Sequence, residues 1–116
     1  MSRSTLLRAA WIAAMLVVGA TALIPTPQLP ALPAYADKLV HLGSYLVLGA
    51  LAVLAQNHHR HRVIAAIAMI GFGILIELVQ ARLPWRSFEW ADIGANVAGV
   101  SLGAGMVWLR TRSPKP

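Results

Sequence analysis

Four long apolar stretches constrain this chain more than any other feature of its sequence. They cover residues 9–24, 39–55, 63–79 and 93–109, and Glu77 is the only Asp, Glu, Lys or Arg within them. A helix needs about 20 predominantly apolar residues to cross a bilayer, and each stretch approaches that length with its flanking residues. We therefore predict an all-α membrane protein, an antiparallel bundle in one domain spanning residues 1–116. Its transmembrane helices are expected at about residues 6–24, 38–55, 63–80 and 92–109.

The composition agrees with a membrane protein and excludes other classes. The chain is 58% hydrophobic and only 12% charged, whereas about 25% charged residues is usual for a soluble domain. It has no cysteine, which excludes disulfides and thiolate chemistry. The net charge of +6 could suit nucleic acid, but the basic residues form no single patch and no aromatic-and-basic module is present. We therefore expect no nucleic-acid partner.

The distribution of basic residues predicts the orientation in the membrane. Basic residues are enriched in cytoplasmic loops, and of the ten in this chain only Lys38, Arg82 and Arg86 fall on one side of the apolar stretches. This predicts an N-in, C-in topology, with a proline-rich connector at 25–36 and a tryptophan-containing loop at 81–91 outside. The cytoplasmic set, which includes the basic tail at 110–116, comprises Arg3, Arg8, Arg60, Arg62, Arg110, Arg112 and Lys115.

The first apolar stretch has an alternative interpretation as a cleavable signal peptide. Arg3 and Arg8 precede an apolar core, and Ala34-Tyr35-Ala36 resembles a cleavage site. The core is long for a signal peptide and ends well before these alanines, so we favour a retained helix. Cleavage would leave three spans without changing the others.

Polar residues cluster near the predicted outer ends of the helices. Asp37, His41 and Tyr45 are spaced by four residues, which places them on one stripe of a helix. Two other helices carry matching polar residues near their outer ends, so we predict that these side chains meet. The predicted cluster comprises Asp37, Lys38, His41, Tyr45, Glu77, Gln80, Arg86, Asp92 and Asn96.

Glu77 is the most informative member because an ionised carboxylate inside a membrane costs several kcal/mol unless it is paired or hydrated. Two interpretations remain open for it. It could be an acid/base, a proton carrier or a ligand-binding anion. It could also be the buried partner of a basic side chain. Candidate partners are Lys38, His41, Arg82 and Arg86.

The other polar residues also have structural interpretations. Asp37 and Asp92 are expected as N-caps of their helices, and Gln80 could bind a ligand or cap a helix end. Arg86 could bind an anion or pair with Glu89. Tyr45 is expected to pack with its hydroxyl bonded to a neighbouring helix.

His41 could form a metal site of mixed nitrogen and oxygen ligands with Glu77, Asp92 and Asp37, but no spacing such as H-E-x-x-H is present. We therefore expect a hydrogen-bonded interhelical histidine, and neither metal nor cofactor.

Asp92, Asn96, Gly99 and Gly103 follow at intervals of 4, 3 and 4 residues. This stripe predicts a close packing seam between helices that carries Asn96 toward Glu77 or His41.

In order along the chain, the polar residues form recognisable motifs. They are D-K-x-x-H-x-x-x-Y from Asp37, E-x-x-Q from Glu77, P-x-R-S from Pro84 and D-x-x-x-N-x-x-G from Asp92. Together they make the chain similar to the VanZ-like family of small bacterial membrane proteins, as far as about Gly103. The resemblance implies an outward-facing polar site near the cell envelope. The founding member is associated with resistance to the glycopeptide antibiotic teicoplanin, a role that is not transferred here.

Three hypotheses for function follow, and they leave open whether the chain is an enzyme. The first is a non-enzymatic protein of the bacterial cytoplasmic membrane that binds an amphiphile or a peptidoglycan- or glycopeptide-related ligand. In it, Lys38 and Arg86 hold an anion while His41 and Glu77 bond the polar part. The second is an enzyme acting on a lipid-linked substrate with Glu77 and His41 as acid–base pair. The third is a proton-coupled transporter subunit, which needs a homo-oligomer because four short helices leave little room for a pathway. Membrane lipid is a partner in all three.

Overall fold

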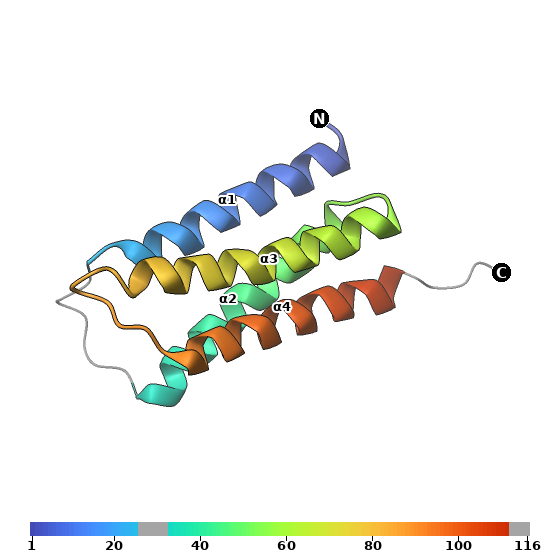
Figure 1. Ribbon diagram of the computed structural model, residues 1–116. Coiled ribbons are helices and arrows are strands. Elements are labelled where there is room, and N and C mark those ends of the chain that lie inside the picture. Colours follow the sequence, from blue (N-terminus) through green and yellow to red (C-terminus); the bar gives the residue numbers. More distant parts are fainter. Residues whose placement is uncertain (26–32, 112–116) are drawn as a thin grey trace.

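The computed structural model describes residues 1–25 and 33–111, and its regular elements in these residues are four α-helices. Each helix is long and apolar enough to cross a membrane, which confirms the predicted all-α membrane protein. Figure 1 shows the helices side by side, with the chain reversing direction between successive helices. The helices are α1 (Arg3–Leu23), α2 (Ala34–Leu54), α3 (His59–Gln80) and α4 (Trp90–Thr111).

All four helices begin earlier than the sequence predicted. α2 starts at Ala34, directly after Pro33. Proline prevents the helix from extending to the residues before it, whereas alanine is a strong helix former. Asp37 therefore lies in the first turn of α2 and is not its N-cap. Asp92 likewise lies in the first turn of α4, which begins at Trp90. Both carboxylates still face the positive end of a helix dipole, which favours an anion there.

The histidine-rich segment at 56–62 follows the second apolar stretch, but only part of it connects α2 to α3. α3 begins at His59, so four of these residues form the first turn of the helix. Histidine and arginine are compatible with a helix, and at the end of a span their side chains can reach water. Polarity marks the end of the apolar stretch here, but it does not mark the end of the helix.

The α2–α4 pair is the most closely packed part of the bundle. A Cβ added at Gly99 or Gly103 of α4 would overlap main-chain atoms of Leu42 and Leu46 in α2. From the opposite side, a Cβ at Gly49 of α2 would lie 2.5 Å from the carbonyl oxygen of Val100. The glycines thus allow the two backbones to touch, as small residues do at helix interfaces in membranes.

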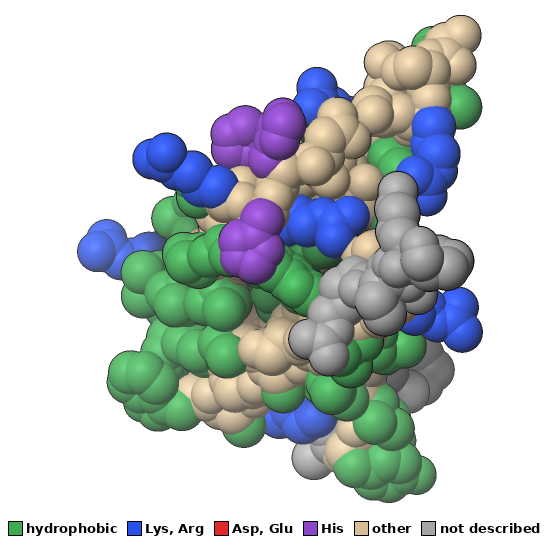
Figure 2. Space-filling view, turned by 90° about the vertical axis from the view of Figure 1, so that its right-hand side faces the viewer, with side chains coloured by type: hydrophobic (Ala, Val, Ile, Leu, Met, Phe, Trp, Pro, Cys, Tyr) green, Lys and Arg blue, Asp and Glu red, His purple; other side chains and the backbone are tan. Residues whose placement is uncertain are grey.

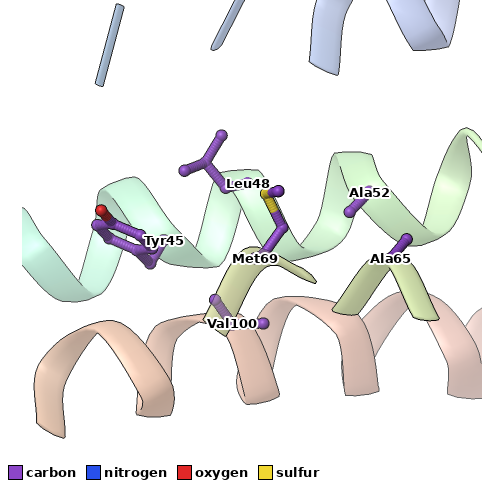
Figure 3. Packing of buried hydrophobic residues seen from close by; sticks show 6 residues of the cluster. All are labelled: Tyr45, Leu48, Ala52, Ala65, Met69 and Val100. Atoms are coloured by element: carbon purple, nitrogen blue, oxygen red, sulfur yellow. The ribbon is translucent and has the colours of Figure 1, made fainter. Parts of the chain in front are cut away.

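The apolar core lies between α2, α3 and α4, as Figure 3 shows. α1 is the outermost helix: it has no buried residue and packs against α2 and α3. Trp11 of α1 reaches this core and donates its indole N–H to the sulfur of Met69 at 3.3 Å. The core residues drawn are Tyr45, Leu48, Ala52, Ala65, Met69 and Val100.

The two ends of the bundle differ in charge. The end of the bundle where α1 and α3 end and α2 and α4 begin is called the polar end. The opposite end is called the basic end. Figure 2 views the basic end, where arginine and histidine side chains gather and no acidic side chain is visible. Hydrogen bonds from Arg62 to Thr111, at 2.6 Å, and from Ser4 to Asn57, at 3.5 Å, join helices at this end. The chain has four acidic residues, and all lie at the polar end: Asp37, Glu77, Glu89 and Asp92.

Candidate functional site

The polar end gathers the residues that the sequence singled out on separate helices. α2 contributes Asp37, Lys38, His41 and Tyr45, while α3, the following loop and α4 contribute the others. Burying this many polar groups is unfavourable unless they bond one another, so their pairing defines what the site can do. The fully buried members are Tyr45, Glu77, Gln80, Asp92 and Asn96.

Lys38 lies at the centre of three carboxylates. Its ammonium donates to Asp92 Oδ1 at 2.6 Å, to Asp37 Oδ2 at 3.2 Å and to a carboxylate oxygen of Glu89. An ammonium group has three donors, and all three are used. The three acids and one lysine leave a formal charge of −2 (−3 + 1), so this cluster favours a cation. The geometry thus argues against Lys38 as the anion-binding group of the first hypothesis.

His41 bridges α2 and α4 on the same side of the cluster. Its Nδ1 lies 3.1 Å from Asn96 Oδ1, and because an amide oxygen can only accept, the imidazole donates from Nδ1. The other ring nitrogen, Nε2, lies 3.6 Å from Asp92 Oδ2 and 3.9 Å from Asp37 Oδ1. The packing stripe of α4 therefore carries Asn96 to His41, one of its two expected partners.

Glu77 is paired with the main chain and not with a basic side chain. Its Oε1 accepts a hydrogen bond of 2.8 Å from the backbone N–H of Glu89, the residue before α4. Within the described residues, no hydrogen bond or salt bridge joins it to the basic side chains considered as partners. The N–H groups at the start of a helix lack intrahelical partners, so Glu77 holds the start of α4 in place.

Three side chains from the end of α3 and the following loop hold the C-terminal end of α1. Arg86 donates to two carbonyl oxygens at 2.8 and 2.9 Å, Trp85 donates to one at 2.9 Å, and Gln80 donates to one at 2.8 Å. Terminal carbonyls of a helix need such partners. The acceptors are Thr21 and Ile24 for Arg86, Leu23 for Trp85 and Ala22 for Gln80.

This arrangement bears on two alternatives that the sequence left open. Arg86 does not pair with Glu89, which binds Lys38 instead. Gln80 does cap a helix end, but the helix is α1 and not its own. The role of Trp85 was not predicted. Its acceptor is a backbone carbonyl, and because every residue has one, the sequence does not indicate which carbonyl a side chain will bind.

Two adjoining cavities open at the polar end. The larger, of about 180 Å³, has an apolar wall formed by Val18, Val40 and Ile76. The other, of about 170 Å³, is almost entirely polar and also contacts Ser87, Glu89 and Asp92. Asp37, His41, Gln80 and Arg86 line both.

Three buried polar atoms beside these cavities have no hydrogen-bond partner in the described structure: Tyr45 Oη, Gln80 Oε1 and Arg86 Nε. The tyrosine hydroxyl was expected to bond a neighbouring helix, and this expectation was wrong. Tyr45 lines the larger cavity, while Gln80 and Arg86 line both cavities. Glu77 lines neither, so a molecule bound there would meet Asp37, His41, Gln80 and Arg86 but not this carboxylate.

Comparison with known protein families gives one result. The sequence model of the VanZ/LLP1 family matches residues 3–111, a range that runs from the first residue of α1 to the last residue of α4. No curated protein and no solved structure matches the chain.

Proposed function

The chain belongs to the VanZ/LLP1 family of membrane proteins, and we propose that its polar end binds the headgroup of an amphiphile. The larger cavity carries this proposal, because it combines an apolar wall with polar groups that lack partners. An unsatisfied buried polar group costs about 1–3 kcal/mol. A headgroup that donates to Gln80 Oε1 and accepts from Arg86 Nε would recover this cost.

The charge of the site selects among headgroups. Lys38 is saturated by carboxylates, and Arg86 directs its terminal nitrogen at two carbonyl oxygens of α1. Lys38 is therefore not free to hold an anion, and the formal charge of −2 around it (−3 + 1) disfavours a strongly anionic group beside Arg86 Nε. We therefore favour a headgroup rich in hydroxyl and amide groups, as in peptidoglycan- or glycopeptide-related amphiphiles.

The apolar part of such a ligand has a route into the site from the bilayer. Val18 of α1 and Val40 of α2 line the cavity, and Val40 is also exposed on the outside of the bundle. A chain lying between α1 and α2 would remain in hydrocarbon while its headgroup entered the cavity. This fits a protein that takes its ligand from the membrane.

The proposed topology places the polar end outside the bacterial cytoplasmic membrane. The basic end carries most of the arginines, which favours a cytoplasmic location. Because the family match includes α1 and three side chains bind the end of that helix, we propose that α1 is retained. Four spans then return both termini to the cytoplasm.

Cysteine labelling tests this topology, because the natural sequence contains no cysteine. Ser87→Cys, in the loop after α3, should react with a membrane-impermeant maleimide in intact cells. Asn57→Cys, at the basic end, should react only after the membrane is permeabilised. The reverse pattern, or labelling of both positions in intact cells, would reject the orientation.

The acid–base pair of Glu77 and His41 gains little support from the geometry. Glu77 lines neither cavity, and its Oε1 already accepts the Glu89 N–H. A general base must reach the proton that it removes. We therefore place Glu77 among the residues that position the site and not among those that contact a ligand.

The ligand proposal is tested by mass spectrometry of amphiphiles that copurify with the intact protein in detergent. Tyr45→Phe removes one unpartnered hydroxyl and should reduce the bound amphiphile several-fold, since one hydrogen bond contributes about 1 kcal/mol. Ser44→Phe, which places a ring in the cavity, should remove it almost completely. Tyr35→Phe is the matched control, because this tyrosine is exposed and lines neither cavity. Equal amounts in all variants, with the composition of bulk membrane lipid, would refute the proposal.

A further inference from the structure

We propose that Asp37, His41 and Asp92 bind a divalent transition-metal ion at the polar end. The site shares Asp37, His41 and Gln80 with the cavities proposed to bind a headgroup, but metal binding can be measured without a bound headgroup. The sequence did not predict it, because the ligands come from two helices and follow no recognised spacing. The proposal depends on the geometry, the orientation of His41, the state of Gln80 and the local charge.

The three ligand atoms have nearly the separation that a metal ion requires. His41 Nε2 lies 3.6 Å from Asp92 Oδ2 and 3.9 Å from Asp37 Oδ1, and one ligand atom from each residue lies within 4.8 Å of the other two. Zinc ligands at about 2.0–2.2 Å in a tetrahedral site lie about 3.3–3.6 Å apart. A small inward movement of the half-exposed Asp37 side chain would complete this geometry.

The orientation of His41 is that of a metal ligand. Its Nδ1 donates to Asn96 Oδ1, which leaves a lone pair on Nε2 in the neutral ring. This lone pair faces two carboxylate oxygens, an arrangement that is repulsive unless a proton or a metal ion lies between them. Metal-bound histidines characteristically have their second nitrogen held by such an acceptor.

Gln80 supplies an independent indication of a ligand. The residue is only 5% exposed, and its Oε1 has no hydrogen-bond partner. It lines the same polar cavity as Asp37, His41 and Asp92. Its Nε2 is fixed on the carbonyl of Ala22, so the amide oxygen is held in place. Amide oxygens are suitable ligands for hard divalent cations.

The charge of the cluster matches a divalent ion. Asp37, Glu89 and Asp92 around Lys38 carry a formal charge of −2 (−3 + 1), which one such ion would neutralise. Lys38 binds Oδ1 of Asp92 while His41 faces Oδ2, so the carboxylate can serve both cations. One imidazole with oxygen ligands suits Zn²⁺ or a neighbouring transition metal better than Mg²⁺ or Ca²⁺.

Metal titration of the full-length protein in detergent tests the proposal, using an affinity tag without histidine and a chelator wash beforehand. Co²⁺ is followed by its visible absorption and Zn²⁺ by calorimetry, and we expect one equivalent of each. Asp37→Asn replaces a half-exposed carboxylate ligand by a weaker, neutral amide at little cost to folding and should weaken binding about tenfold. His41→Ala should abolish the Co²⁺ absorption, with helix content measured on the same sample.

The histidines at the basic end provide the matched control. His58, His59 and His61 lie close together there and could hold metal nonspecifically. The triple variant His58→Ala, His59→Ala, His61→Ala should keep the stoichiometric site unchanged. Loss of binding in that variant alone would overturn the proposal, as would failure of the natural protein to bind either ion or unaltered binding in folded Asp37→Asn.

Discussion

Gly103 of α4 lies so close to Leu46 of α2 that a Cβ at this glycine would overlap the leucine carbonyl. Gly99 has the same relation to Leu42 one turn earlier in α4. Both contacts involve main chain, which cannot move aside as a flexible side chain can. Since helix association in lipid depends on van der Waals packing and not on the hydrophobic effect, the α2–α4 pair depends on the absence of side chains here.

We predict that Gly103→Ala strongly destabilises the protein. Separating the helices or straining the backbone typically costs about 1–3 kcal/mol, and the unfolding temperature in detergent should fall. Gly105→Ala is the matched control in the same helix, because a Cβ there meets nothing within 4 Å. It should leave stability unchanged or raise it by up to about 1 kcal/mol through better helix propensity. Equal effects of the two substitutions would show that the close approach is unimportant.

The contact between Glu77 and Glu89 predicts a different pattern for substitutions of the buried carboxylate. Glu77→Gln retains an Oε1 that can accept the Glu89 N–H, so the unfolding temperature should change little. Glu77→Leu removes the acceptor of this part-buried N–H, which costs about 1 kcal/mol. The comparison is made by thermal unfolding in detergent.

The same two variants distinguish a positioning role from a chemical one. If Glu77 only holds the start of α4, ligand binding should survive in Glu77→Gln at close to the natural level. A folded Glu77→Gln protein that bound no amphiphile would show that the negative charge itself is needed, contrary to our assignment.

Arg86 is predicted to control how firmly α1 is attached at the polar end. Arg86→Ala removes two hydrogen bonds to α1 carbonyls, so the last turn of α1 should open more readily. Hydrogen exchange in that turn should accelerate by about tenfold or more, with α2 and α4 unaffected. Arg82→Ala is the control, since Arg82 is exposed and makes no side-chain hydrogen bond or salt bridge within the described residues. Equal acceleration in both variants would contradict this role.

The helices and the gathering of polar residues could be predicted from the sequence because both follow from helical periodicity and apolar length. The four-residue spacing of Asp37 and His41 places them on one stripe whatever the tertiary structure. Gly99 and Gly103 could be placed in a packing seam for the same reason. These predictions require only the geometry of a single helix.

Partner choice could not be predicted in the same way. Arg86 and Trp85 bind carbonyl oxygens of α1, and such acceptors exist in every residue. Glu77 similarly binds a backbone N–H although four basic side chains were available to it. Backbone partners are chosen by the three-dimensional position of helix ends, which depends on the packing of the whole bundle.

Lys38 is predicted to stabilise the polar end by separating three carboxylates. Lys38→Gln would leave the buried Asp92 without its 2.6 Å ammonium partner and would raise the repulsion among the acids. Loss of a charged partner from a buried group costs about 1–3 kcal/mol, so the unfolding temperature should fall. Because the repulsion is electrostatic and the cluster is partly exposed, added salt should recover part of the loss.

Arg60→Gln is the matched control, because it also removes one positive charge but lies exposed at the basic end, away from the acidic residues. It should change the unfolding temperature little at any salt concentration. If Asp37, His41 and Asp92 hold a divalent ion, Zn²⁺ should raise the unfolding temperature of Lys38→Gln by more than that of the natural protein. The formal charge around the ion would then be −3 instead of −2. Equal stabilisation of both proteins by Zn²⁺ would place the ion elsewhere.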